Sequence, residues 1–265
     1  MQDASIRLRL TPCLWLFSLL SAWLLTANAQ AGNLHITPLR LNLDENTQTT
    51  QLSIENQSLQ PVTLQASIMR WRQQGDQDLL QPSNDIFVSP PILRLSPGGH
   101  QVLRLKYMGN MPARREIAYR LYLQDTAARA NRNGGANMAI RIGLPVFVSP
   151  STSHAEPKVQ TRYQNGTWRV LVSNTGNAHF RVIGIDAFGA NADRNKLKKD
   201  DVLGQSTQAI HGFPYVFPDQ TREWHLKAPA NAQLRIRTDV YGRHQQGFDR
   251  RGMAWLGEPE NNKTP

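Results

Sequence analysis

Short runs in which apolar and polar residues alternate dominate the chain from residue 34 onward. Alternation is typical of β-strands with one buried face, because successive side chains of a strand point to opposite sides of the sheet. No run shows the period of an amphipathic helix. In the first half, polar turns rich in Asn, Gly and Pro separate runs at residues 34–43, 51–55, 62–71, 101–107, 116–123 and 138–148. The polar residues 73–78 are predicted to form a loop, and the whole pattern predicts an all-β chain built as β-sandwiches.

The run at residues 138–148 alternates most strictly. Its apolar positions are Met138, Ile140, Ile142, Leu144 and Val146. Pro145 lacks an N–H group, which favours an edge strand or a bulge. A long apolar edge strand is an aggregation hazard that most proteins blunt with charges or cover with another element. This strand is therefore expected either to complete a buried core or to be kept ready for a partner.

The second half of the chain also consists of short alternating runs separated by polar turns, but its sequence does not repeat that of the first half. A Pro- and Ser-rich stretch at residues 149–157 is typical of a linker. We therefore expect an N-terminal domain at residues 32–150, a second β-sandwich at residues 151–258 and a disordered tail at residues 259–265. Strands of the second domain are predicted at residues 167–172, 179–185, 223–226 and 232–237.

Residues 1–31 have the composition of a cleaved signal peptide. A basic start at Arg7 and Arg9 precedes an apolar run from Cys13 to Leu25, and small residues follow at Ala27 and Ala29. The run is short for a membrane span, so a retained anchor is the less favoured alternative. Removing this segment removes the only cysteine, so the exported protein must be stabilised by core packing without disulfides. No later run is long enough to span a bilayer, so no stable membrane insertion is expected.

Net charge and the missing motifs exclude several classes of function. The formal charge is +10, but the basic residues are scattered and form no stripe interleaved with aromatics, so no nucleic acid partner is expected. The excess charge is compatible with a solvated surface or an acidic partner. Nucleotide-binding, serine-hydrolase and zinc-protease motifs are absent, and the seven histidines lack metal-ligand spacing. We expect a binding protein without a cofactor or metal, not an enzyme.

Several motifs, in order, carry a resemblance to a known family. They are Pro38-Leu-Arg40, Ile54-Glu-Asn56, Pro90-Pro91-Ile-Leu-Arg94-Leu, Arg115-Glu116, Phe147-Val-Ser-Pro150 and, more weakly, Val172-Ser-Asn174. Behind a signal peptide, this series resembles the periplasmic pilus-assembly chaperones of the chaperone–usher pathway. The Leu-Pro-Val-Phe-Val ending of the alternating strand is similar to that of the divergent, archaic branch.

The resemblance implies two immunoglobulin-like domains in a boomerang arrangement and a role in the periplasm. It also implies two partners, a pilus or fimbrial subunit and an outer-membrane usher. In such chaperones, an edge strand complements a subunit that lacks its own last strand. The donor residues would be Met138, Ile140, Ile142, Leu144 and Val146.

The family further implies a charged anchor for the C-terminal carboxylate of the subunit. In the best-described members an arginine in the first strand and a lysine in the donor strand form it. Arg40 matches the arginine, but Pro145 stands at the position of the lysine. Arg120 and Arg141 are therefore candidates for the second charge, since a guanidinium presents a planar fork that suits a carboxylate.

Two readings from other classes remain open. A secreted structural or adhesive β-protein, such as a pilus subunit, would also contain a strongly alternating strand. A carbohydrate-binding or hydrolytic sandwich could use exposed tryptophans. The two-domain length and the motifs around Pro90 and Glu116 favour the chaperone.

Overall fold

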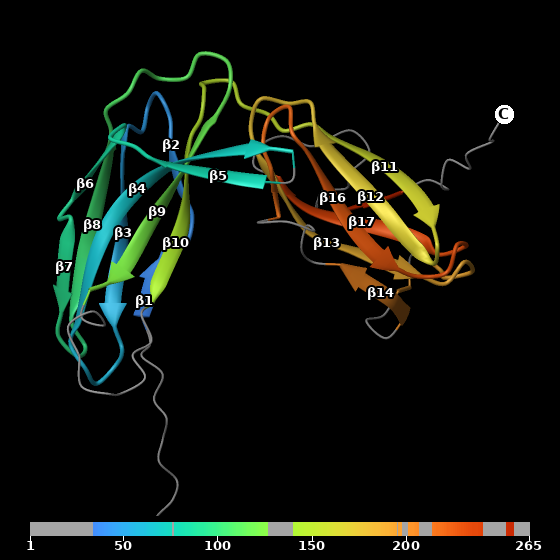
Figure 1. The fold of residues 1–265 in the computed structure, drawn as a ribbon, viewed down its shortest axis with the longest axis horizontal. Helices are drawn as coiled ribbons and strands as arrows, with labels where there is room; N and C mark the ends of the chain where they lie inside the picture. The colour runs from blue at the N-terminus through green and yellow to red at the C-terminus, as the bar shows by residue number, and fades with distance from the viewer. Residues whose placement is uncertain are drawn as a thin grey trace, which may run out of the picture.

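The chain folds as two β-sandwiches that meet at an angle, as seen in the computed structural model in Figure 1. The structure describes residues 34–75, 77–126, 140–194, 196–197, 201–206, 214–240 and 253–256. All regular elements in these ranges are strands, which confirms the predicted fold class. The predicted signal peptide, the tail and Met138 lie outside the described residues.

The first sandwich consists of two sheets. One sheet has the order β1 (Leu34–Thr37), β3 (Thr49–Asn56), β8 (His100–Tyr107) and β6 (Ile86–Ser89). The other has the order β2 (Leu41–Leu43), β10 (Arg141–Val148), β9 (Ile117–Asp125), β4 (Val62–Gln74) and β5 (Gln77–Pro82), with β7 (Ile92–Leu95) also pairing with β4. The start of the chain thus changes sheets between β1 and β2. Alternate residues of both sheets, such as Leu52, Leu103 and Leu121, fill the core between them.

The second sandwich is built in the same way from two further sheets. One sheet has the order β11 (Pro157–Gln164), β12 (Thr167–Asn174) and β16 (Thr221–Lys227). The other has the order β14 (Val202–Ser206), β13 (Phe180–Phe188), β17 (Gln233–Val240) and β18 (Met253–Trp255), and β15 (Tyr215–Val216) also pairs with β13. Trp168, Trp224 and Ile236 belong to its separate core.

One buried asparagine holds a turn together in each sandwich. The side-chain amide of Asn56 donates to the carbonyls of Gln60, Leu95 and Ser96. In the second sandwich, Asn174 donates to the carbonyls of Ala178 and Val216. Buried backbone carbonyls need hydrogen-bond donors, and each asparagine amide donates to carbonyls that strand pairing does not satisfy. Each asparagine thereby links separate segments of the chain.

The predicted loop at residues 73–78 is instead the tip of a hairpin. Strand β4 continues to Gln74, and β5 begins at Gln77. Gly75 adopts a φ of +57°, which glycine tolerates without steric cost, and this allows the tight turn. In register, Gln73 faces Asp78. The hairpin extends toward the second sandwich (Figure 1), where these polar side chains find their partners.

Candidate functional site

Strand β10 has a partner along its whole length on only one side. Antiparallel to it, β9 pairs with every residue from Arg141 to Val148. On the other side β2 pairs with it in parallel, and only over Val146 to Val148. No other described strand pairs with this edge from Arg141 to Pro145. Those residues therefore present unpaired main-chain groups to which a further strand could add.

The apolar positions of this strand differ in how far they are buried. Leu144 and Val146 are almost fully buried in the core of the first sandwich, whereas Ile142 is partly buried against it. Ile140 precedes β10 and is also partly buried. Val146 lies where β2 covers the edge. Ile140 and Ile142 are therefore the least covered of the described apolar positions, and Leu144 lies beside them but is almost fully buried.

The opposite face of this sheet carries two of the predicted anchor residues, Arg141 on β10 and Arg120 on β9. The Arg141 guanidinium carbon lies 3.9 Å from the centre of the Tyr122 ring, at the far end of the open edge. Arg120 faces Pro145 in register and stacks over Trp71 at 3.9 Å. Arg120 is only 2% exposed, and this burial lowers the pKa of its guanidinium. Arg120 thus lies beside Pro145, but beneath the surface.

An apolar cluster joins the two sandwiches at the C-terminal end of β10. Phe147 packs against Trp71 of the first sandwich and against Tyr215 and Phe217 of the second. The ring of His179 stacks on Phe147, with ring centres 3.5 Å apart. The end of the open strand is thereby fixed in the junction of the two sandwiches.

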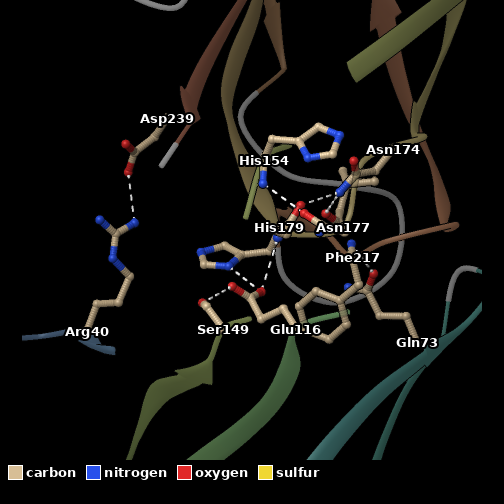
Figure 2. Close-up of polar contacts among 12 residues, drawn as sticks. Arg40, Gln73, Glu116, Ser149, His154, Asn174, Asn177, His179, Phe217 and Asp239 are labelled. Atoms are coloured by element: carbon tan, nitrogen blue, oxygen red, sulfur yellow. Dashed lines mark hydrogen bonds and ion pairs between the residues drawn. The ribbon is translucent and has the colours of Figure 1, made fainter. Parts of the chain in front are cut away.

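Two polar contacts reinforce this junction (Figure 2). The Gln73 side chain donates to the Tyr215 carbonyl at 2.9 Å and accepts from the Phe217 N–H at 3.0 Å. Glu116 accepts from the backbone N–H of His179 at 3.1 Å and lies 2.6 Å from its Nδ1. Both contacts satisfy buried polar groups, so separating the sandwiches would expose apolar surface and break these bonds.

Arg40 immediately precedes β2 and reaches the second sandwich. Its Nη1 is 3.5 Å from Oδ2 of Asp239, a residue of β17 in the second sandwich (Figure 2). Nη2 of Arg181, on β13, is 3.3 Å from the same oxygen. The Tyr215 ring lies in the field of these three charges and of Arg120. Burial raises the pKa of Tyr215, so its hydroxyl is neutral at physiological pH.

Three residues at this junction were not foreseen from the sequence. Arg181 and Asp239 lie in ordinary strand patterns, and nothing local separates them from solvated surface charges. Glu116 belongs to a recognised motif, but its partner His179 could not be assigned. Among the described residues, no group of three His, Cys, Asp or Glu side chains is placed to hold a metal ion.

The structure thus combines two β-sandwiches with an edge strand that is open from Arg141 to Pro145 and ends at their junction. Residues 33–154 match the family model described as pili and flagellar-assembly chaperone, PapD N-terminal domain. This match covers the first domain, which is therefore similar to the pilus-assembly chaperones. The comparison with curated protein sequences finds no match.

Solved structures of chaperones share the fold over most of their length. A chain of the CsuC–CsuE chaperone–tip adhesion subunit complex from archaic Csu pili of Acinetobacter baumannii is 19% identical, with a TM-score of 0.52 over 76% of this chain and 92% of that one. The CupB2 chaperone of Pseudomonas aeruginosa is 20% identical, with a TM-score of 0.51 over 80% and 100%. A chain of the Salmonella enterica SafA pilin–SafB chaperone complex is 15% identical, with a TM-score of 0.54 over 80% and 91%. At these identities the likeness concerns the fold.

Where the structure describes the chain, it contains no helix with the length and apolar character needed to cross a membrane.

Proposed function

We propose that this protein is a periplasmic chaperone that binds pilus subunits lacking their last strand and delivers them to an outer-membrane usher. The observation that carries the proposal is the edge of β10 from Arg141 to Pro145, which no described strand covers. An exposed apolar edge of this kind is a hazard unless a guest uses it. Members of the family that the first domain matches assemble pili.

The pairing of β2 indicates how a guest strand would lie. Strand β2 runs parallel to β10 and begins at Leu41, opposite Val146. A guest that continues the line of β2 along the open edge would also run parallel to β10. Its last residue would then reach Arg40, the residue before β2. This direction would bring the terminal carboxylate of the guest beside a guanidinium.

The donor strand would contribute main-chain hydrogen bonds and the side chains of Ile140 and Ile142. Each net hydrogen bond is worth about 0.5–1.5 kcal/mol, and complete burial of an isoleucine about 1.5–3 kcal/mol. Part of this is offset by the loss of freedom on association. Met138 would extend the same face at its N-terminal end.

The remaining parts of the proposal concern processing and domain limits. Residues 1–31 would direct export and be removed, and residues 32–150 and 151–258 would form the two domains. The linker would end where β11 begins, at Pro157. The role is binding without catalysis, in keeping with the family, and it requires no cofactor.

The test is co-expression with a candidate pilus subunit, followed by recovery of the complex from the periplasm. We expect the double variant Ile140→Asp/Ile142→Asp to lose most of the bound subunit. The matched control is Ile92→Asp/Ile183→Asp, which places two aspartates at exposed isoleucines away from β10. Equal subunit recovery by both variants would overturn the donor-strand proposal. Incorporation of this chain into sheared pili would favour the structural-protein alternative instead.

A further inference from the structure

Asp239 occupies a position between two arginines that come from different sandwiches. Its Oδ2 is 3.5 Å from Nη1 of Arg40 and 3.3 Å from Nη2 of Arg181. Arg181 and Asp239 are direct partners in the pairing of β13 with β17, whereas Arg40 reaches them across the junction. Figure 2 shows the Arg40–Asp239 contact beside the Glu116–His179 pair.

The contacts of Asp239 are loose for charged groups. Strong charge-assisted hydrogen bonds between nitrogen and oxygen measure about 2.7–2.9 Å, and both distances here are longer. The side chains of Arg40, Asp239 and Arg181 are 26%, 36% and 42% exposed, so water and ligands reach them. Partly solvated pairs of this kind contribute little stability and exchange partners readily.

Asp239 is shared by two cations. Two guanidinium groups surround one carboxylate, and the buried Arg120 contributes to the same field around Tyr215. In addition, Nε of Arg181 is a buried atom of this partly exposed side chain and has no hydrogen-bond partner among the described residues. This Nε and the Nη2 that contacts Asp239 lie on the same edge of the guanidinium, which is suited to gripping both oxygens of a carboxylate.

We propose that Arg40 and Arg181 together form the anchor for the terminal carboxylate of a guest strand, and that Asp239 occupies this anchor in the free chaperone. This rests on the proposed function, because the guest strand is what brings its terminus to Arg40. Arg181 supplies the second cation that Pro145 cannot supply. The arriving carboxylate replaces Asp239 at Arg40, so that guest binding is an exchange of one ion pair for another.

The anchor has a consequence for specificity. Because its two cations come from different sandwiches, the position of the carboxylate is fixed relative to both domains. A guest strand that ends one residue too early or too late would not bring its carboxylate to Arg40. Asp239 would then stay paired with Arg40. A one-residue shift would also present the wrong face of the guest to β10, so both effects select the same register.

The test uses a peptide with the last fifteen residues of the same candidate pilus subunit. The peptide is made as a free acid and as a C-terminal amide. Binding to the exported chaperone is measured by calorimetry, and the readout is the ratio of the two dissociation constants. We expect the wild type to prefer the acid by about tenfold or more, since a hydrogen bond to a charged group contributes on that scale. Arg181→Ala should reduce this preference to a few-fold at most, whereas Asp239→Asn should strengthen binding of the acid alone.

Controls separate the anchor from general effects on folding. Arg181→Lys keeps the charge but loses the fork, so it should retain only part of the preference. Arg162→Ala removes an exposed arginine of β11 and should leave the ratio unchanged. If Arg40→Ala lowers the preference while Arg181→Ala and Asp239→Asn leave it unchanged, the two-domain anchor is wrong and the proposed function stands. If the wild type binds neither peptide nor the whole subunit, the proposed function fails as well.

Discussion

Glu116 and His179 join the two sandwiches through two hydrogen bonds to a single carboxylate oxygen. Oε1 of Glu116 accepts from the backbone N–H of His179 and contacts its Nδ1, while Oε2 accepts from the hydroxyl of Ser149. Both side chains are almost completely buried, and the imidazole stacks on Phe147. The carboxylate therefore ties β9, the end of β10 and the start of β13 into one rigid junction beside the open edge.

Removing this carboxylate should loosen the junction. We expect Glu116→Ala to lower the free energy of unfolding by about 1–3 kcal/mol, because it leaves the buried N–H of His179 without this acceptor. The angle between the sandwiches should also become more variable, which small-angle scattering would detect. Ser149→Ala removes one hydrogen bond and should cost only about 0.5–1.5 kcal/mol. An unchanged scattering profile for Glu116→Ala would show that the apolar cluster alone fixes the angle.

Gly143 of β10 lies close to the side chains of Tyr122 and Arg120 on the neighbouring strand β9. A Cβ at this position would lie 2.9 Å from Cε1 of Tyr122 and 3.3 Å from Cδ of Arg120. We therefore expect Gly143→Ala to displace the Tyr122 ring, on which Arg141 stacks, and to destabilise the first sandwich by about 1–3 kcal/mol. Thermal unfolding and recovery of the subunit complex measure the two effects. Gly189→Ala is the matched control, since its Cβ would meet nothing within 4 Å.

Much of the fold followed from the sequence because strand alternation is a local property. The pattern placed every long strand of the first sandwich and marked β10 as unusual, and short motifs identified Arg40 and Glu116. The hairpin of β4 and β5 was missed for a physical reason. Gln73 and Asp78 are polar residues of the kind found in loops. Their side chains are largely buried because the second sandwich provides partners for them, the Tyr215 carbonyl and Arg222.

The proposed anchor of Arg40 and Arg181 is even harder to predict from the sequence than the hairpin. Arg181 and Asp239 are 58 residues apart and meet through the register of β13 and β17. Arg40 reaches them only because the two sandwiches pack at one angle. No period or motif encodes that geometry. The resemblance names Arg40 as a candidate anchor, and its role stays a prediction, as do those of Arg120 and Arg141. The structure separates those two, with Arg120 buried beside Pro145 and Arg141 exposed at the far end of the open edge.

The ion pair between Arg222 and Asp78 should be the most costly polar contact to break. Arg222 of β16 is fully buried, and Asp78 lies at the tip of the hairpin from the first sandwich. Losing one partner of a buried pair typically costs about 3–5 kcal/mol. We expect Asp78→Ala to fall in this range in urea unfolding. The double variant Asp78→Leu/Arg222→Met should be more stable than Asp78→Ala, because it removes both charges. A double variant as unstable as the single one would contradict this account.

Asp186 should make the stability of the second sandwich depend on pH. Burial acts to raise the pKa of this carboxyl, but hydrogen bonds from Arg237, Arg235 and Gln205 outweigh burial and hold the pKa below its ordinary value. A carboxyl with a lowered folded-state pKa stabilises the protein above its unfolded-state pKa, about 3.9 for aspartate. That contribution disappears as the pH falls through the lower folded-state value.

Asp186→Asn should therefore be less stable than the wild type by about 3 kcal/mol at pH 7. The gap should narrow as the pH falls below about 4, where the wild type begins to lose the same charge. Urea unfolding at pH 7, 5 and 3 measures the gap directly. Glu45→Gln removes an exposed carboxylate and should follow the wild type at every pH. A gap that stays constant from pH 7 to pH 3 would show that the side chain acts through its shape and hydrogen bonds, not through its charge. The contacts of Arg235 and Arg237 on β17 with residue 186 of β13 would then not depend on the charge of Asp186.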